Sequence, residues 1–299
     1  MSTAEPAVLR DSGTVMGRLR PALRQTKRLS RKNPTMVGGI AVVTAMIIIA
    51  AIAPFITAYS PRQLSPGDRL HGPSGEHWFG TDNVGRDIYA RTVYGTRISL
   101  QVGFSVAILT MAVAAVVGLV AGYYRKADMI LMRLMDGLMA IPNLFVASAL
   151  MALLGASVRN IIIALLIAMT PQAARVVRAS VLSLREEVYV GAAKAIGASD
   201  WRIIVFHILP GTVAPLIIQG TYTCAVAILV EASLSFLGAG VPPDVSSWGI
   251  VMAEGRNFVR VAIWMVLFPG TALFLMILGV NLAGDGLRDI LDPKLQRRE

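Results

Sequence analysis

Charged residues are scarce in this chain. Asp, Glu, Lys and Arg together make up 15% of its 299 residues, while hydrophobic residues make up 55%. A soluble globular protein of this length needs more polar material than that to cover its surface. The mean hydropathy of +0.63 also argues against a soluble globular protein. We therefore expect a protein that uses lipid as its main solvent.

Several catalytic and binding signatures are also missing. No Gly-x-x-x-x-Gly-Lys-Ser/Thr phosphate-binding loop occurs, so the chain is not an ATPase of that class. No Ser/His/Asp arrangement stands out, and the three histidines, His71, His77 and His207, lack the spacing of metal ligands. The single cysteine, Cys224, excludes an intramolecular disulfide. We predict a non-enzyme, with no metal and no cofactor bound by this chain.

Long apolar runs are what the sequence has instead. A helix needs roughly 20 apolar residues to cross the hydrocarbon core of a bilayer. Six runs are long enough, at residues 37–58, 99–123, 130–154, 161–181, 213–236 and 261–282. We predict an all-α polytopic membrane protein with six transmembrane helices. Pro171, Arg175 and Arg178 interrupt the fourth run, which is expected either to leave the membrane early or to continue into the cytoplasm as a polar helix.

Lys and Arg are distributed unequally between the two sides of these runs. Twenty of the 28 lie on the side that holds both termini and the connection at 185–212. The positive-inside rule places that side in the cytoplasm. The predicted domains are a basic cytoplasmic tail at 1–36, a six-helix domain at 37–282 with an outer loop at 59–98, and a cytoplasmic tail at 283–299. Because the charge excess follows topology, we expect anionic lipid and not nucleic acid as the partner of the basic tail.

The connection before the fifth run has an unusual pattern. Residues 191–210 read GAAKAIGASDWRIIVFHILP, which predicts two short helices broken at Gly197, a residue that readily takes the left-handed conformation. Ser199 is expected to cap the second helix and Asp200 to favour its N-terminal end, while Pro210 is expected to stop it. The segment is therefore predicted to form a helical elbow.

The second arm of this elbow is expected to be amphipathic. Trp201, Ile204 and Ile208 would share one helical face at i, i+3 and i+7, with Arg202 and His207 available for polar contacts. The first arm consists mostly of small residues, which allow close approach by another chain. We interpret the elbow as a docking element, the alternative being an ordinary connection between two spans.

The elbow resembles the EAA signature of ABC importer permeases, the cytoplasmic loop that contacts the ATPase subunit. Ala192, Ala193, Gly197, Leu209 and Pro210 fall on that signature. Gly191 and His207 depart from it, standing where the family has Glu and Ile, and Glu187 lies one helical turn earlier and could replace the missing carboxylate. The resemblance implies that ATPase coupling involves Glu187, Gly191, Ala192, Ala193, Gly197, Ala198, Ser199, Asp200, Trp201, His207 and Pro210.

Charges and glycines also gather in the outer loop. Asp82, Arg86, Asp87, Arg91 and Arg97 lie close together in sequence, among Gly80, Gly85 and Gly95. These charges are expected either to form a solvated, mutually paired surface or to contact substrate directly. The sequence of this segment, FGTDNVGRDIYARTVYGTRISL, resembles the outer-loop signature of the C-type permease subunit of oligopeptide and dipeptide ABC importers. That signature includes Gly80, Thr81, Asp82, Gly85, Arg86 and Asp87.

Further stretches resemble the same subfamily, in the same order along the chain: RKNPTMVGG from Arg31, EASLSFLGAGVPPDVSSWGIVMAE from Glu231 and GDGLRDILDPKL from Gly284. The resemblance implies a type I ABC importer permease fold in a bacterial cytoplasmic membrane. It also implies a heterodimer with a homologous permease, two cytoplasmic ATP-binding subunits that hold ATP and magnesium, and an extracytoplasmic peptide-binding protein. Nickel chelates, glutathione or another small solute remain alternative cargoes, and a stand-alone secondary transporter or channel is the alternative of a different class.

A few polar residues lie within the predicted spans. Glu231 is followed by Ser233 and Ser235 in the fifth run, and Asp136 lies in the third. An ionised carboxylate at the bilayer centre costs roughly 2.5–3.5 kcal/mol on insertion scales, so it should face water or protein. These four residues are candidates for the translocation path or for a subunit interface. Gly118 and Gly122, four residues apart, predict a site of close helix packing.

Overall fold

The computed structural model describes residues 34–291, so most of the predicted basic tail, residues 1–33, and residues 292–299 lie outside the described part. Within residues 34–291 the named elements are all helical, which confirms the predicted fold class. The α-helices are α2 (Pro34–Ile56), α3 (Ile88–Tyr123), α4 (Arg125–Met139), α5 (Asn143–Leu154), α6 (Val158–Arg185), α7 (Val188–Ala195), α8 (Asp200–Ile203), α9 (Leu209–Phe236), α10 (Trp248–Gly255) and α11 (Trp264–Leu291). Three short helical segments join them: η1 (Pro66–Asp68), η2 (Ile204–Ile208) and η3 (Arg256–Phe258).

Five helical segments of the described chain are long and apolar enough to cross a membrane, and they contain α2, α3, α6, α8 with α9, and α11. The third predicted span, at 130–154, is not one straight helix, and it completes the predicted six only if a bent helix pair is counted as one span. It is formed by α4 and α5, which are bent by 89° relative to each other. The bend falls at Pro142, which has no amide hydrogen and disfavours a helical conformation at the preceding Ile141.

Other helix bounds also differ from the prediction. The second span begins eleven residues early, at Ile88, because the Asp87 carboxylate accepts a hydrogen bond from the Ala90 amide at 2.7 Å and caps α3 there. The fourth span is not broken at Pro171, because α6 continues as one helix to Arg185; the cytoplasmic location of its end stays a prediction. The last helix extends to Leu291, so residues 283–291 belong to α11 and not to a separate tail.

Helix α3 is the central element of the bundle and packs against α2, α6, α9 and α11. Its contact with α6 depends on two glycines. A Cβ atom at Gly118 would lie 2.5 Å from Val177 Cβ, and one at Gly122 would lie 2.6 Å from Val181 Cβ. No side chain fits at such distances, so the predicted close packing at Gly118 and Gly122 is confirmed.

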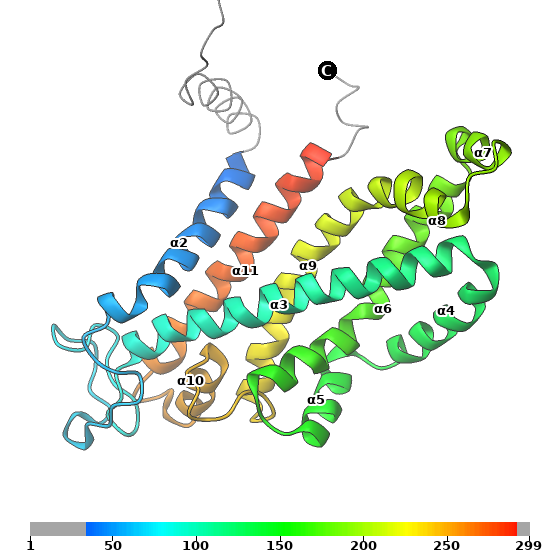
Figure 1. Ribbon diagram of the computed structural model, residues 1–299. Coiled ribbons are helices and arrows are strands. Elements are labelled where there is room, and N and C mark those ends of the chain that lie inside the picture. The colour runs from blue at the N-terminus through cyan, green and yellow to red at the C-terminus, as the bar shows by residue number, and fades with distance from the viewer. Residues whose placement is uncertain (1–33, 292–299) are drawn as a thin grey trace, which may run out of the picture.

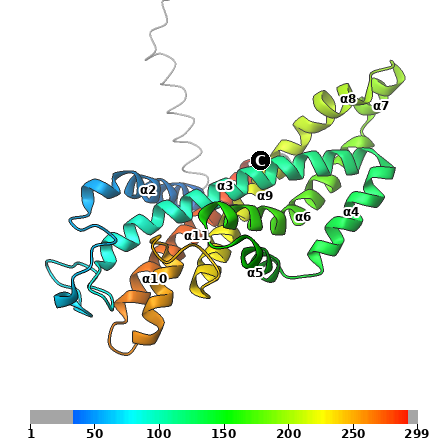
Figure 2. The ribbon, with the colours of Figure 1, turned by 60° about the horizontal axis from the view of Figure 1, so that its bottom comes forward.

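The two ends of the bundle carry different elements (Figure 1). The loop at 59–87 and α10 lie together at one end, and α7 with α8 projects at the opposite end. The start of α2 and the end of α11 also lie away from the loop. A second view shows the same separation, with α7 and α8 at the tip farthest from the loop (Figure 2). The candidate sites therefore divide into an elbow end and a loop end.

Candidate functional site

The elbow has the predicted break. Gly197 separates α7 from α8 with a φ of +81°, in the left-handed region that favours glycine. Its amide donates to the Lys194 carbonyl at 3.0 Å, and the next amide, of Ala198, donates to the Ala193 carbonyl at 3.0 Å. These two bonds close the end of α7 in the manner of a left-handed helix cap. The turn thus fixes the angle between the two arms.

The second arm differs from the prediction at its ends. Ser199 stands at the capping position of α8, but its side chain makes no capping hydrogen bond. Pro210 does not stop the helix, because it lies in the first turn of α9, where no amide hydrogen is needed. The π-helical segment Ile204–Ile208 joins α8 to α9, so the arm and the fifth span are continuous.

The predicted apolar face of this arm is also wrong in part. Ile204 and Ile208 are buried, whereas Trp201 is 72% exposed. The side of α8 that packs on the bundle carries Ile203 together with Ile204, and Trp201 lies outside that side. Trp201 therefore belongs to the outer surface of the elbow.

Tyr123, at the end of α3, contacts both arms of the elbow. The Tyr123 hydroxyl donates to Asp200 Oδ1 at 2.7 Å, and the Lys194 ammonium lies 5.3 Å from the centre of the Tyr123 ring. One contact involves the second arm and the other involves the first. Movement of the elbow is therefore mechanically linked to α3.

The inner side of the elbow packs against the ends of α3 and α6. Burying an isoleucine side chain contributes about 1.5–3 kcal/mol, and several take part. The cluster comprises Leu119, Val177, Val181, Val190, Ala193, Ile203, Ile204 and Ile208. Ala193, predicted to contact an ATPase, is thus 5% exposed and faces its own chain. The packing makes the elbow a rigid extension of the two spans.

The outer side of the elbow exposes apolar side chains. We call Val188, Ile196, Trp201 and Phe206 the elbow surface; they are 87%, 86%, 72% and 68% exposed. Solvent-exposed apolar side chains gathered on a projecting element mark an interaction site. The sequence prediction named only Trp201 of these four, although Val188, Ile196 and Phe206 could have been found from their apolar character in a connection between two spans.

The remaining predicted coupling residues lie around this surface. Gly191 and Ala192 are exposed in α7, and Gly191 has open space beside it. Glu187 is exposed and directly precedes α7, where its carbonyl accepts from the Gly191 amide at 3.1 Å. The His207 carbonyl is 3.3 Å from the Tyr189 hydroxyl, which donates to it. Glu187 therefore stands at the start of the first arm, free to contact a partner.

At the other end of the bundle, four charged side chains form a compact network. We call Asp82, Arg86, Arg91 and Glu254 the outer clasp. Asp82 Oδ2 lies 2.6 Å from Arg86 Nε and 2.7 Å from Arg91 Nη1. Glu254 Oε2 lies 2.6 Å from Arg86 Nη2 and 2.5 Å from Arg91 Nη1. The clasp joins the loop at 59–87 to α3 and α10.

Burial distinguishes the clasp from an ordinary surface network. Asp82 is 0% and Arg91 1% exposed, so the expected pairing is confirmed but the expected solvated surface is wrong. Burial by itself would lower the pKa of the Arg86 guanidinium, but the carboxylates of Asp82 and Glu254 raise it above its ordinary value. The guanidinium therefore stays charged, and the clasp has no accessible side chain for binding substrate at Asp82 or Arg91.

The glycines of the outer-loop signature are required by the backbone. Gly80 and Gly85 have φ values of +74° and +81°, and a Cβ at Gly85 would lie 1.8 Å from the Ser65 carbonyl oxygen. Asp82 Oδ1 accepts the amides of Val84 and Arg86 at 2.9 Å each. Thr81 hydrogen bonds to the Asp68 carbonyl. The signature thus builds a tight turn that presents Asp82 to the arginines.

The four predicted path or interface residues have different surroundings. Glu231 is 0% exposed; it accepts from the Ser235 hydroxyl at 2.9 Å and lies 3.5 Å from the Ser99 hydroxyl. Ser233 donates to its own helix, at the Leu229 carbonyl. Asp136 is exposed and pairs with Arg175 at 2.6 Å. Glu231 and Ser235 are thus enclosed within this chain between α3, α9 and α10, and their role in a path or an interface stays a prediction.

Substitution of Glu231 should destabilise the fold more when more of its hydrogen bonds are removed. Glu231→Gln keeps the volume and an acceptor for Ser235, so we expect a decrease in stability below about 1 kcal/mol. Glu231→Ala leaves the serine hydroxyls unsatisfied and opens a cavity, at a cost of about 2–5 kcal/mol. Thermal unfolding of the purified protein measures both. Equal stability of the two variants would contradict the enclosed hydrogen-bonded role.

Comparison with known proteins gives the family. Residues 114–297 match the family model described as the inner membrane component of binding-protein-dependent transport systems. Residues 23–73 match the N-terminal transmembrane domain of oligopeptide transport permease C. The chain belongs to the family of binding-protein-dependent transport permeases. It is therefore the multi-pass permease component of an ABC importer, as the elbow and outer-loop motifs predicted.

Individual members of this family are similar over nearly the whole chain. A dipeptide transport system permease protein, DppC, of Alkalihalophilus pseudofirmus is 45% identical over 96% of this chain and 93% of its own length. A putative peptide transport system permease of Brucella suis is 46% identical over 92% and 93%. A glutathione transport system permease, GsiD, of Pectobacterium atrosepticum is 40% identical over 90% of each chain.

Proposed function

We propose that this permease carries peptides, dipeptides or short oligopeptides, into the cell. The observation that supports this most is the 45% identity to a dipeptide permease over 96% of the chain. The chain would form the translocation path with a homologous permease and would receive cargo from an extracytoplasmic peptide-binding protein. Two cytoplasmic partner subunits would hold ATP and magnesium, while this chain would bind no cofactor.

The proposed orientation places both termini and the elbow in the cytoplasm. Support comes from the unequal distribution of basic residues, with twenty of 28 on that side, and from the opposite positions of the elbow and the outer loop in the bundle (Figure 1). In this orientation the elbow surface faces the ATP-binding subunits. Its inner side packs on α3 and α6, so ATP-driven motion at the elbow would reach the spans directly.

Glutathione is a second candidate cargo. It is favoured by the 40% identity to a glutathione permease over 90% of the chain, and nickel chelates or other small solutes fit the same framework. A stand-alone transporter or channel is not favoured, because the chain belongs to a family of multi-component transport systems.

Reconstitution with its partners tests the peptide proposal. We expect proteoliposomes that contain this chain, its companion permease, the ATP-binding subunits and the binding protein to accumulate radiolabelled dialanine when loaded with ATP. Omitting ATP, or omitting this chain, provides the matched controls. Accumulation of glutathione without accumulation of dialanine or tetra-alanine would replace peptides by the second candidate, and accumulation without ATP would refute the importer mechanism.

A further inference from the structure

A polar groove opens on the membrane-spanning part of the bundle. Its cavity has a volume of about 290 Å³ and lies between α6, α9 and α11. Its polar lining residues are Thr221, whose hydroxyl donates to the Ile218 carbonyl of its own helix, and six others that we call the polar groove: Gln172, Gln219, Tyr222, Asn281, Asp285 and Arg288. None of them was predicted to be a path or interface residue, although Asp285 and Arg288 lie in the stretch GDGLRDILDPKL that resembles the permease subfamily. Nothing in the elbow or the outer clasp accounts for them.

The position of these polar side chains along the membrane-spanning helices is unusual, because three of them lie far from the helix ends. Gln172, Gln219 and Asn281 each lie ten or more residues from both ends of a helix that is apolar enough to span a membrane. At 1.5 Å per residue, this corresponds to about 15 Å from either helix end. Asp285 and Arg288 lie nearer to the end of α11. The groove thus runs from the middle of the spans towards the end of the bundle that carries the elbow.

These six side chains are also unsatisfied within the chain. Across residues 34–291, none of them has a hydrogen-bond or ion-pair partner. A polar group without a partner is costly in an apolar surrounding, so side chains of this kind at membrane depth face water, ligand or another protein. By contrast, the buried carboxylate of Glu231 in the same helix α9 does have a partner within the chain, the Ser235 hydroxyl.

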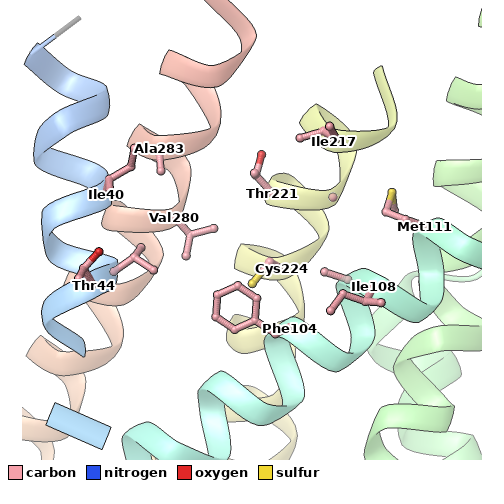
Figure 3. A pocket seen from close by; sticks show the side chains of 13 residues that line it. Ile40, Thr44, Phe104, Ile108, Met111, Ile217, Thr221, Cys224, Val280 and Ala283 are labelled. Carbon is pink, nitrogen blue, oxygen red and sulfur yellow. The ribbon is translucent and has the colours of Figure 1, made fainter. Parts of the chain in front are cut away.

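Helices α9 and α11 also line an apolar cavity. A second cavity, of about 470 Å³, lies between α2, α3, α9 and α11. Ile217, Cys224 and Val280 line it, together with Phe104 and Ile108 of α3 (Figure 3). Helix α9 therefore presents Ile217 to the apolar cavity and Gln219, two residues later, to the polar groove. The side of α9 that lines the apolar cavity is compatible with lipid, and the side that lines the polar groove is compatible with water.

We propose that the polar groove is the wall that this chain contributes to the translocation route, and that it binds the main chain of a passing peptide. This inference depends on the proposed peptide cargo. Side-chain amides both donate and accept hydrogen bonds, so Gln172, Gln219 and Asn281 match peptide groups of any sequence. Asp285 and Arg288 supply opposite charges for the amino and carboxyl ends of a short peptide.

A buried contact with the companion permease explains these residues less well. The fully buried cores of subunit interfaces are depleted in charged residues, whereas the groove contains both a carboxylate and a guanidinium. An open, water-filled route requires no partner group for each amide. The two roles also differ in what they predict for the assembled complex, because an interface excludes water from the groove and a route does not.

Cysteine accessibility separates the two roles. In a Cys224→Ser background, Gln219→Cys is compared with Ile217→Cys in the assembled complex, held in lipid nanodiscs so that both membrane sides are open. A negatively charged methanethiosulfonate reacts with the thiolate, which requires water. We expect the cysteine at 219 to react at least about tenfold faster than the cysteine at 217. The complex with Cys224→Ser alone gives the background from the partner subunits.

Transport after modification completes the test. In ATP-loaded proteoliposomes, modification at 219 should remove most of the dialanine uptake, and saturating dialanine should slow the modification. An unreactive cysteine at 219, or modification that leaves uptake unchanged, would overturn the proposed route. Failure of the peptide proposal would give a different result, because the unmodified complex itself would then not accumulate dialanine.

Discussion

Replacement of Asp82 by Asn is expected to destabilise the protein by about 3 kcal/mol or more. Asp82 is 0% exposed and lies 2.7 Å from the guanidinium of Arg91, which is 1% exposed. Asparagine has nearly the same shape but no charge, so Arg91 would keep only Glu254 as a counter-ion. Removing one partner of a buried ion pair typically costs about 3–5 kcal/mol, because the other charge remains desolvated.

The single cysteine provides the measurement. Cys224 is 3% exposed in the native bundle, so a thiol-reactive fluorophore reports thermal unfolding of the purified chain in detergent. Arg62→Ala is the matched control, because it removes an ion pair of similar length, 2.9 Å to Asp244, whose side chains are 66% and 64% exposed. A solvent-exposed pair of this kind contributes about 0–1 kcal/mol. Equal unfolding temperatures for Asp82→Asn and Arg62→Ala would show that the clasp does not hold the loop end together.

The spans could be predicted from the sequence because hydropathy reports burial in lipid directly. The exception, the bend between α4 and α5, shows the limit of that signal. Ile141 and Pro142 interrupt the helix in a run that is apolar enough overall to span a membrane despite Arg133 and Asp136, so hydropathy alone does not distinguish one straight span from two bent helices. The residue at which α3 begins could not be predicted from hydropathy, because it depends on the Asp87 cap.

The sites could be predicted where local backbone chemistry determines them, as at Gly197. Ion pairs between segments that are distant in the sequence could not be predicted. Glu254 lies 163 residues from Arg91, and the sequence around either residue does not indicate that the two form an ion pair. The exposed position of Trp201 depends on which side of α8 packs on the bundle, and that side carries Ile203 and Ile204. The polar groove likewise forms only when α6, α9 and α11 come together.

The elbow gives the largest expected effect on transport. Gly197 has a φ of +81° and donates its amide hydrogen to the Lys194 carbonyl at 3.0 Å. Proline fixes φ near −65° and has no amide hydrogen, so Gly197→Pro cannot form this turn and should cost about 3 kcal/mol or more at the elbow. That energy corresponds to about a hundredfold decrease in the population of the native elbow conformation. Because the elbow surface is proposed to contact the ATP-binding subunits, ATP-driven uptake should fall to background.

Gly197→Asn is the matched control. Asparagine adds a side chain at the same position, where no atom lies within 4 Å of the added Cβ, and it tolerates the left-handed conformation at a cost of about 1 kcal/mol. We expect this variant to retain most of its dialanine uptake in ATP-loaded proteoliposomes. Thiol-detected unfolding should show that the spans of both variants remain folded, since the turn lies outside the bundle core. If Gly197→Pro transported as well as Gly197→Asn, the angle between the two arms would have no part in coupling ATP hydrolysis to the spans.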